Sequence, residues 1–321
     1  SDIERLCPLA RFEVKMKRLI SVLCVITLLF SAFSVVSFAG GDEFKPYEDS
    51  RFFEYGDYSI HYRVLPAEGE FKGRVMMLHG FVCSTYSWRN LAPLLAEAGY
   101  EVVLADLPSF GYSTRESASV AFVPRETLIA ELMKSIAHIE EWVIAGHSMG
   151  GGVAVNIAEE QPVKALLLYC PAPQSEFPEA VQGLVTSRFT EGVMNAFFNY
   201  GTRLSPLVRL VIWAATNDLE FAKSYDLSGV TAPVQHDGFG AGMCEMMYRV
   251  RPTDLENVGK IVCPVLLCQA DKDIVLKADM KERMNSAFPN AVTYEVKGGG
   301  HQCIENRAAE LAKVTLDFLG N

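Results

Sequence analysis

Short apolar runs alternate with amphipathic stretches along most of the chain beyond residue 50. The runs that predict buried strands lie at residues 75–78, 101–105, 142–145, 165–169, 264–268 and 292–296. Helical spacing follows at residues 91–98 and 124–139, and the second stretch opens on Pro124. Residues 52–65 predict a hairpin with its turn at Gly56. Strands that alternate with helices predict an α/β fold, with a mostly parallel central sheet and helices on both faces.

Residues 174–258 interrupt this alternation. They are rich in Phe, Met, Tyr and Trp and contain helix-like runs at 192–200 and 207–215. We expect them to form a helical cap, or lid, inserted into a core made of residues 40–173 and 259–321. The cap has no long exposed amphipathic run in this interpretation, so we expect no activation at an oil–water interface.

The front of the chain has a different pattern. Residues 19–39 are almost wholly apolar and follow a basic stretch at 16–18, which is typical of a secretory signal peptide. Ser37 and Ala39 fit the small-residue positions before a cut, so we expect a leader over residues 1–39 and an exported protein. The alternative is an uncleaved membrane anchor, because about 20 apolar residues can span a bilayer.

Composition and charge narrow the function. About 280 residues remain after residue 39, enough for one α/β domain with an insertion. The whole chain has a net charge of −10. Residues 1–39 hold five basic and three acidic residues, so the remainder carries −12. An acidic surface argues against a nucleic-acid partner. After leader cleavage we expect no membrane partner.

One motif carries the chemistry. Gly146-His147-Ser148-Met149-Gly150 matches G-x-S-x-G and lies between a predicted strand and a helix-like stretch at 151–160. A strand that turns directly into a helix forces its apex residue into a strained conformation, and the neighbours must be small. This places Ser148 as a candidate nucleophile.

A serine nucleophile needs a base and an acid, which in this architecture follow it in the order acid, then base. The late strand at 264–268 ends in a segment with Asp271 and Asp273, and His301 follows three glycines on a loop expected to be flexible. We assign His301 as the base and Asp273 as the acid, with Asp271 as the competitor.

An early strand ends in His79-Gly80-Phe81. Acyl transfer builds negative charge on the carbonyl oxygen, and two main-chain N–H groups can hold it. Those of Phe81 and Met149 are the candidates, and His79 is interpreted as structural.

Together these segments resemble the α/β-hydrolase fold family, which includes esterases, lipases, carbon–carbon bond hydrolases and cofactor-free haloperoxidases. The resemblance extends over nearly all of the chain from residue 50 and includes Asp106 to Ser113, where Ser109 replaces a usual glycine. It implies a serine hydrolase that cleaves carboxylic esters, a small-molecule substrate, no cofactor and no metal. Ser148 excludes the sister enzymes that use an aspartate nucleophile.

Two alternatives remain: a carbon–carbon bond hydrolase or cofactor-free haloperoxidase or perhydrolase with the same triad, and a non-catalytic binding protein. His147, Cys83, Met243 and Met247 are candidate substrate contacts. A bridge between Cys83 and Cys303 is a further hypothesis. The Met-rich cap suggests short to medium acyl chains.

Overall fold

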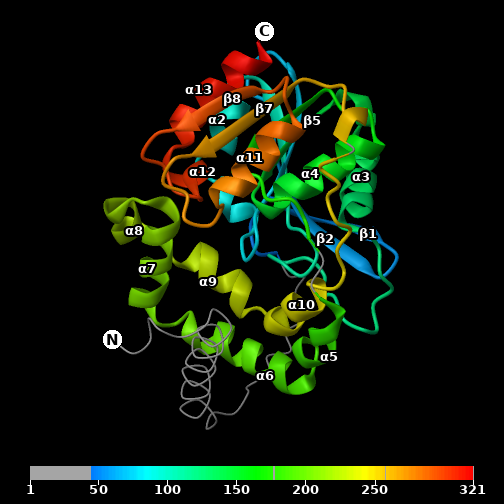
Figure 1. Ribbon diagram of the computed structural model, residues 1–321, viewed down its shortest axis with the longest axis vertical. Helices are drawn as coiled ribbons and strands as arrows, with labels where there is room; N and C mark the ends of the chain where they lie inside the picture. Colours follow the sequence, from blue (N-terminus) through cyan, green and yellow to red (C-terminus); the bar gives the residue numbers. More distant parts are fainter. Residues whose placement is uncertain (1–44, 176–177, 257, 321) are drawn as a thin grey trace, which may run out of the picture. The chain divides into compact units, whose positions relative to one another are not determined.

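The computed structural model describes residues 45–175, 178–256 and 258–320, and its centre is an eight-stranded sheet (Figure 1). The strand order is β1-β2-β4-β3-β5-β6-β7-β8. The strands are β1 (Ser50–Tyr55), β2 (Tyr58–Leu65), β3 (Gly73–Leu78), β4 (Tyr100–Ala105), β5 (Trp142–His147), β6 (Ala165–Tyr169), β7 (Val265–Ala270) and β8 (Val292–Val296). From β4 to β8 all neighbours are parallel, whereas β1 and β2 form an antiparallel hairpin at one edge.

Helices cover both faces of the sheet. One hydrophobic cluster joins the sheet to α3 (Arg125–Ile136), α4 (Met149–Glu160) and α11 (Ala278–Ala287). A second cluster joins the opposite face to α2 (Ala92–Glu97), α12 (Cys303–Asn306) and α13 (Ala308–Leu319). The predicted α/β-hydrolase fold, with a mostly parallel sheet between helical layers, is confirmed.

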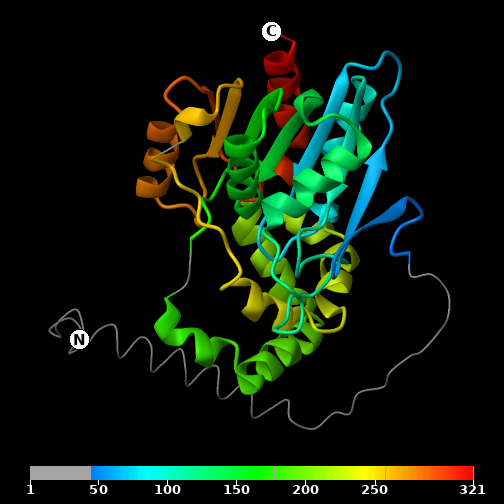
Figure 2. The ribbon, with the colours of Figure 1, turned by 90° about the vertical axis from the view of Figure 1, so that its right-hand side faces the viewer.

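The segment between β6 and β7 is helical, and we call residues 178–250 the cap. Its helices are α5 (Gln182–Val185), α6 (Arg188–Ala196), α7 (Ser205–Thr216), α8 (Leu219–Ser224), α9 (Ser228–Gln235) and α10 (Phe239–Met246), with a π-helical turn at Phe197–Gly201 after α6. Figures 1 and 2 show α5 and α6 at the end of the described chain farthest from the sheet.

The chain enters and leaves the cap at one neck. Gln174 N donates to Thr253 Oγ1 at 3.0 Å, and Thr253 N donates to Gln174 O at 3.0 Å. The buried guanidinium of Arg125 donates to Gln174 Oε1 and to the Met246 carbonyl, and it pairs with Glu116 at 3.3 Å. Core and cap are therefore tied by a buried ionic and main-chain network.

Two local expectations were wrong. The helix predicted over residues 124–139 ends at Ile136, because Ala137 adopts an extended backbone with φ −157°. The cap does expose an amphipathic helix face: Leu207, Leu210 and Val211 on α7 are exposed. Composition shows that a helix is apolar but does not show which side faces the core.

The predicted leader lies outside the described residues. Within the described ranges, no helix combines the length and apolar character needed to cross a bilayer.

Glycines set the distance between α4 and the sheet. A Cβ on Gly150, in the first turn of α4, would overlap the Leu78 carbonyl of β3, and one on Gly146 would overlap the Gly150 carbonyl. A Cβ on Gly151 would lie 2.6 Å from Pro171 Cβ. The helix can follow β5 without a loop only because these side chains are absent.

We predict that Gly150→Ala destabilises the protein by about 1–3 kcal/mol, because the backbone must shift to admit the methyl group. The melting temperature should fall by roughly 2–4 °C per kcal/mol. Gly192→Ala in α6 is the matched control, since a Cβ there meets nothing within 4 Å. It should leave the melting temperature unchanged or raise it. Equal effects of the two changes would contradict this account of the α4 packing.

Candidate functional site

Ser148 forms the turn between β5 and α4, with φ 51° and ψ −122°. This left-handed backbone is costly for a residue with a side chain. Main-chain bonds hold it on both sides: Ser148 N donates to Tyr169 O at 3.1 Å, and Ser148 O accepts from Gly151 N and Ala172 N. The strained turn leaves the Ser148 hydroxyl at the carboxyl end of the sheet.

His301 and Asp273 lie beside this serine. His301 Nε2 is 2.9 Å from Ser148 Oγ, and His301 Nδ1 is 2.8 Å from Asp273 Oδ2. The carboxylate can only accept, so Nδ1 carries the proton and the Nε2 lone pair faces the hydroxyl. Burial alone would raise the pKa of Asp273, but the hydrogen bond and charge of His301 and two main-chain donors lower it overall. Three residues chosen from separate parts of the sequence therefore form one hydrogen-bonded chain.

Asp271 occupies a different place. Its Oδ1 accepts from Gly298 N at 2.6 Å, and its Oδ2 pairs with Lys272 at 3.5 Å. It stabilises the loop after β8, whereas Asp273 bonds to His301. Ala270 before them is buried at the end of β7, and its alanine side chain fits there.

The glycines before His301 serve close packing, contrary to the expected flexible loop. A Cβ on Gly300 would overlap the Ala215 carbonyl at the end of α7. Gly300 N donates to Thr216 O at 3.2 Å, and Gln302 N donates to Ala215 O at 2.8 Å. The end of cap helix α7 thus holds the main chain on both sides of His301, a contact that the sequence interpretation missed.

The early loop approaches the serine from the other side. A Cβ on Gly80 would lie 2.9 Å from His147 Nδ1 and 3.1 Å from Ser148 Cβ, so a side chain there would require these neighbours to shift. The next residues turn sharply, with Cys83 N donating to Gly80 O at 3.2 Å and Val82 at φ 57°. Among the main-chain hydrogen bonds of the described residues, neither Phe81 N nor Met149 N is a donor. Both predicted oxyanion donors are therefore available to a ligand.

His79 is structural, as predicted. It is fully buried, its Nε2 accepts from Leu107 N at 3.0 Å, and its Nδ1 donates to Gly80 O at 2.7 Å. Burial lowers its pKa, so the ring is neutral.

Asp106, which the sequence interpretation noted only as part of a motif, organises the same loop. Its buried carboxylate accepts from Thr85 N at 2.6 Å and Tyr112 N at 2.9 Å, and bonds to His61 Nδ1 at 2.7 Å. The nearby Ser109 has φ 69°, where glycine is usual, and its hydroxyl accepts from Glu116 N. Hydrogen bonding offsets the strain that the substitution brings.

His147 is a positioning residue in this structure. It is buried, and its Nε2 donates to the His301 carbonyl at 2.9 Å. Its Nδ1 has no hydrogen-bond partner among the described residues. Burial and the neighbouring charge of His301 lower the pKa of His147 to about 3. His147, which the sequence predicted to contact substrate, is therefore a neutral ring that supports the main chain of His301.

The other candidate contacts lie in different surroundings. Cys83 lines a small cavity of about 30 Å³ between the early loop and α9 of the cap, and burial raises its pKa to about 11. Met243 is buried in the cluster that also contains Phe239 and Phe110, and Met247 packs against it. These methionines bind the cap to the core.

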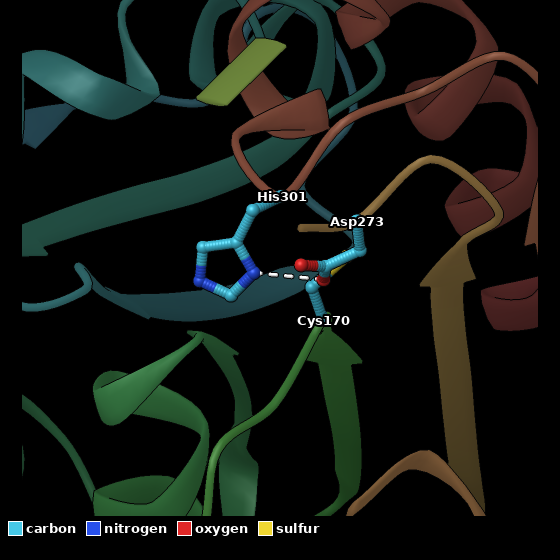
Figure 3. A group of neighbouring side chains, drawn as sticks. All are labelled: Cys170, Asp273 and His301. Carbon is cyan, nitrogen blue, oxygen red and sulfur yellow. Dashed lines mark hydrogen bonds and ion pairs between the residues drawn. The ribbon is translucent and has the colours of Figure 1, made fainter. Parts of the chain in front are cut away.

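All six cysteines of the described chain are free. Cys303 lies 3.7 Å from Cys170, sulfur to sulfur, instead of bridging Cys83. Cys170, Asp273 and His301 bring one donor atom each within 4.8 Å of one another (Figure 3). Two of these groups are hydrogen-bonded to each other, so a metal there would break the bond from His301 to Asp273.

Comparisons with known proteins agree with the fold. A sequence model of the α/β hydrolase fold matches residues 73–307. The chain is 25% identical over 263 residues to the uncharacterized hydrolase YugF of Bacillus subtilis strain 168, across 76% of this chain and 89% of that protein. It is 28% identical over 272 residues to a 2-hydroxy-6-oxononadienedioate/2-hydroxy-6-oxononatrienedioate hydrolase of Cupriavidus pinatubonensis. This match covers 77% of this chain and 86% of that protein.

Among solved structures, a bromoperoxidase from Bacillus anthracis matches with a TM-score of 0.64 at 18% identity, across 85% of this chain and 100% of that one. The chain therefore belongs to the α/β-hydrolase fold family.

We predict that His147 makes the protein less stable in mild acid. Its folded pKa lies below the unfolded value near 6.5, so the unfolded chain binds one more proton between the two values. As the pH falls through this window, the free energy of unfolding should decrease by about 1.4 kcal/mol per pH unit because of this residue. The free energy of unfolding is measured in urea at pH values from 6.5 to 4.5. For His147→Gln, its change per pH unit should be smaller than that of the natural protein by about 1.4 kcal/mol.

The matched control is His138→Gln, which lies on the surface after α3. It should keep the slope of the natural protein. A His147→Gln slope equal to that of the control would disprove the assignment of a buried neutral ring.

Proposed function

We propose that the protein is a serine hydrolase that cleaves carboxylic esters through an acyl-enzyme intermediate. The observation that carries this proposal is the hydrogen-bonded chain from Ser148 Oγ through His301 to Asp273, with distances of 2.9 and 2.8 Å. A serine hydroxyl is a weak nucleophile until a base removes its proton, and this arrangement supplies both the base and the group that orients it.

In the first half of the reaction, Ser148 Oγ attacks the ester carbonyl carbon while His301 Nε2 takes the hydroxyl proton. The imidazolium that forms is stabilised by Asp273, whose lowered pKa keeps it ionised at neutral pH. His301 then gives the proton to the departing alkoxide, and the alcohol leaves behind an acyl-serine.

The tetrahedral intermediate bears a negative oxygen. The main-chain N–H groups of Met149 and Phe81 are the donors that would hold it. Gly80 brings their loop against the serine, and the strained Val82 fixes its turn. Donors that are already in place cost no reorganisation at the moment of reaction.

Water completes the cycle. It enters where the alcohol left, gives a proton to His301 Nε2 and attacks the acyl carbon. Collapse of the second tetrahedral intermediate returns the proton to Ser148 and releases the acid. The cycle uses these side chains, the main-chain N–H groups of Phe81 and Met149, and water.

A second function has one observation in its favour. A relative that matches 77% of this chain at 28% identity is named as a 2-hydroxy-6-oxononadienedioate hydrolase, which supports cleavage of a carbon–carbon bond as the second proposal. The two functions differ in the bond that breaks and in the leaving group, which is an enol carbon in place of an alkoxide.

We predict that Ser148→Ala lowers kcat for p-nitrophenyl esters by about 10⁴ to 10⁶, because attack then loses its nucleophile. A fluorophosphonate probe should label the natural protein at one site per chain and leave Ser148→Ala unlabelled. Retention of most of the turnover would show that another group performs the attack. If 2-hydroxy-6-oxo dienoates are cleaved while a panel of esters is not, the second function replaces the first.

The two neighbouring carboxylates provide a matched pair. Asp273→Asn should lower kcat by roughly 10³ to 10⁴, because an amide favours the wrong tautomer of His301. Asp271→Asn should change kcat less than about threefold, since Asp271 only accepts from Gly298 N and pairs with Lys272. The measurement is kcat for ester hydrolysis at pH 7.5. The melting temperatures of both variants are compared with that of the natural protein to show that they are folded. The reverse ranking would transfer the acid role to Asp271.

A further inference from the structure

The cap exposes many large apolar side chains on its surface. Of the exposed large hydrophobic residues in the described chain, most lie between residues 181 and 219: Val181, Leu184, Phe189, Phe197, Leu204, Leu207, Leu210, Val211, Trp213 and Leu219. Phe189 is 75% exposed and Leu184 is 69% exposed. Single exposed hydrophobic residues are ordinary, but this density on successive helices marks an interaction surface.

On α7 the exposed residues form a stripe. Leu204, Leu207, Leu210 and Val211 recur at the spacing of one helix face. The opposite face is occupied, because Ile212 packs with Ala222 and Tyr225. The stripe therefore lies on the side of α7 that faces away from this packed cluster.

The inner face of α6 is occupied in the same way. A Cβ on Gly240 of α10 would overlap the main chain at Met194 and Asn195, so the two helices touch through their backbones. Asn195 Oδ1 also accepts from Ala241 N at 3.0 Å. Phe189 and Phe197 lie outside this contact and remain exposed.

The charge of this region differs from that of the chain. Residues 181–219 hold three arginines, Arg188, Arg203 and Arg209, and two carboxylates, Glu191 and Asp218, which leaves +1. The whole chain has −10. Leucine, phenylalanine and tryptophan beside arginine, with few carboxylates, are the composition of helices that lie in the interface of an anionic bilayer.

We propose that the exposed face of α5, α6 and α7 binds the surface of an anionic lipid bilayer. The apolar side chains enter the boundary between headgroups and acyl chains, and Arg188 and Arg203 contact lipid phosphates. Arg209 instead donates to the carbonyls of Ala222, Lys223 and Tyr225. This surface replaces the expectation of a cap without an interfacial face, and it does not depend on the reaction that the site performs.

The docking helix also reaches the candidate site. The last carbonyls of α7, at Ala215 and Thr216, accept from the main chain on both sides of His301. The helix proposed to bind the bilayer therefore also contacts the main chain around the proposed base.

The chain offers a site-specific test, because Trp88 and Trp142 are fully buried and Trp213 is the remaining tryptophan. The reporter is the full-length double variant Phe189→Trp/Trp213→Phe. The control is Phe71→Trp/Trp213→Phe, since Phe71 is exposed but lies before β3, away from the cap. Each is mixed with vesicles of phosphatidylglycerol and phosphatidylcholine whose acyl chains carry bromine, a contact quencher of tryptophan.

We expect a blue shift and quenching at position 189 and neither at position 71, with weaker binding to pure phosphatidylcholine. Adding Leu207→Gln and Leu210→Gln to the reporter should raise the lipid concentration for half-quenching by about tenfold or more.

Equal quenching at both positions, or none at position 189, overturns the proposal. A blue shift at 189 that grows with protein concentration without vesicles also overturns it, because a second copy of the chain would then cover the face.

Discussion

The structure depends on one tight main-chain turn. Ser148 has a left-handed backbone that its side chain disfavours, and the turn persists because three main-chain hydrogen bonds join it to Tyr169, Gly151 and Ala172. That geometry requires α4 to begin directly after β5 and to lie against β3, which in turn excludes side chains at Gly146 and Gly150. The strain is offset by packing elsewhere, so the hydroxyl emerges toward His301 without any loop to position it.

The residues of the hydrogen-bonded chain could be predicted from sequence because their signals are local. Ser148 lies between an apolar strand and a helix, and Asp273 and His301 each follow a strand in the order that the fold requires. Parallel strands bring such carboxyl ends to one edge of the sheet. The choice of Asp273 over Asp271 follows from the family spacing, which places the acid three residues after Ala270.

The supporting contacts could not be predicted in the same way. The bond from His147 to the His301 carbonyl and the contact of α7 with Gly300 join segments that are remote in sequence. Three glycines before a histidine suggested mobility, yet glycine is equally required where another backbone approaches closely. The apolar residues of the cap were visible in sequence, but their direction depends on what each helix packs against.

The neck between Gln174 and Thr253 has a consequence for how this protein can change. The two ends of the insertion are hydrogen-bonded to each other, so the cap is a loop whose ends are held together at the core. Closing a loop costs only slowly more entropy as it lengthens. A shorter or longer cap would therefore close on the core at nearly the same entropic cost, provided that it kept the carbonyls of Ala215 and Thr216 that hold the main chain around His301.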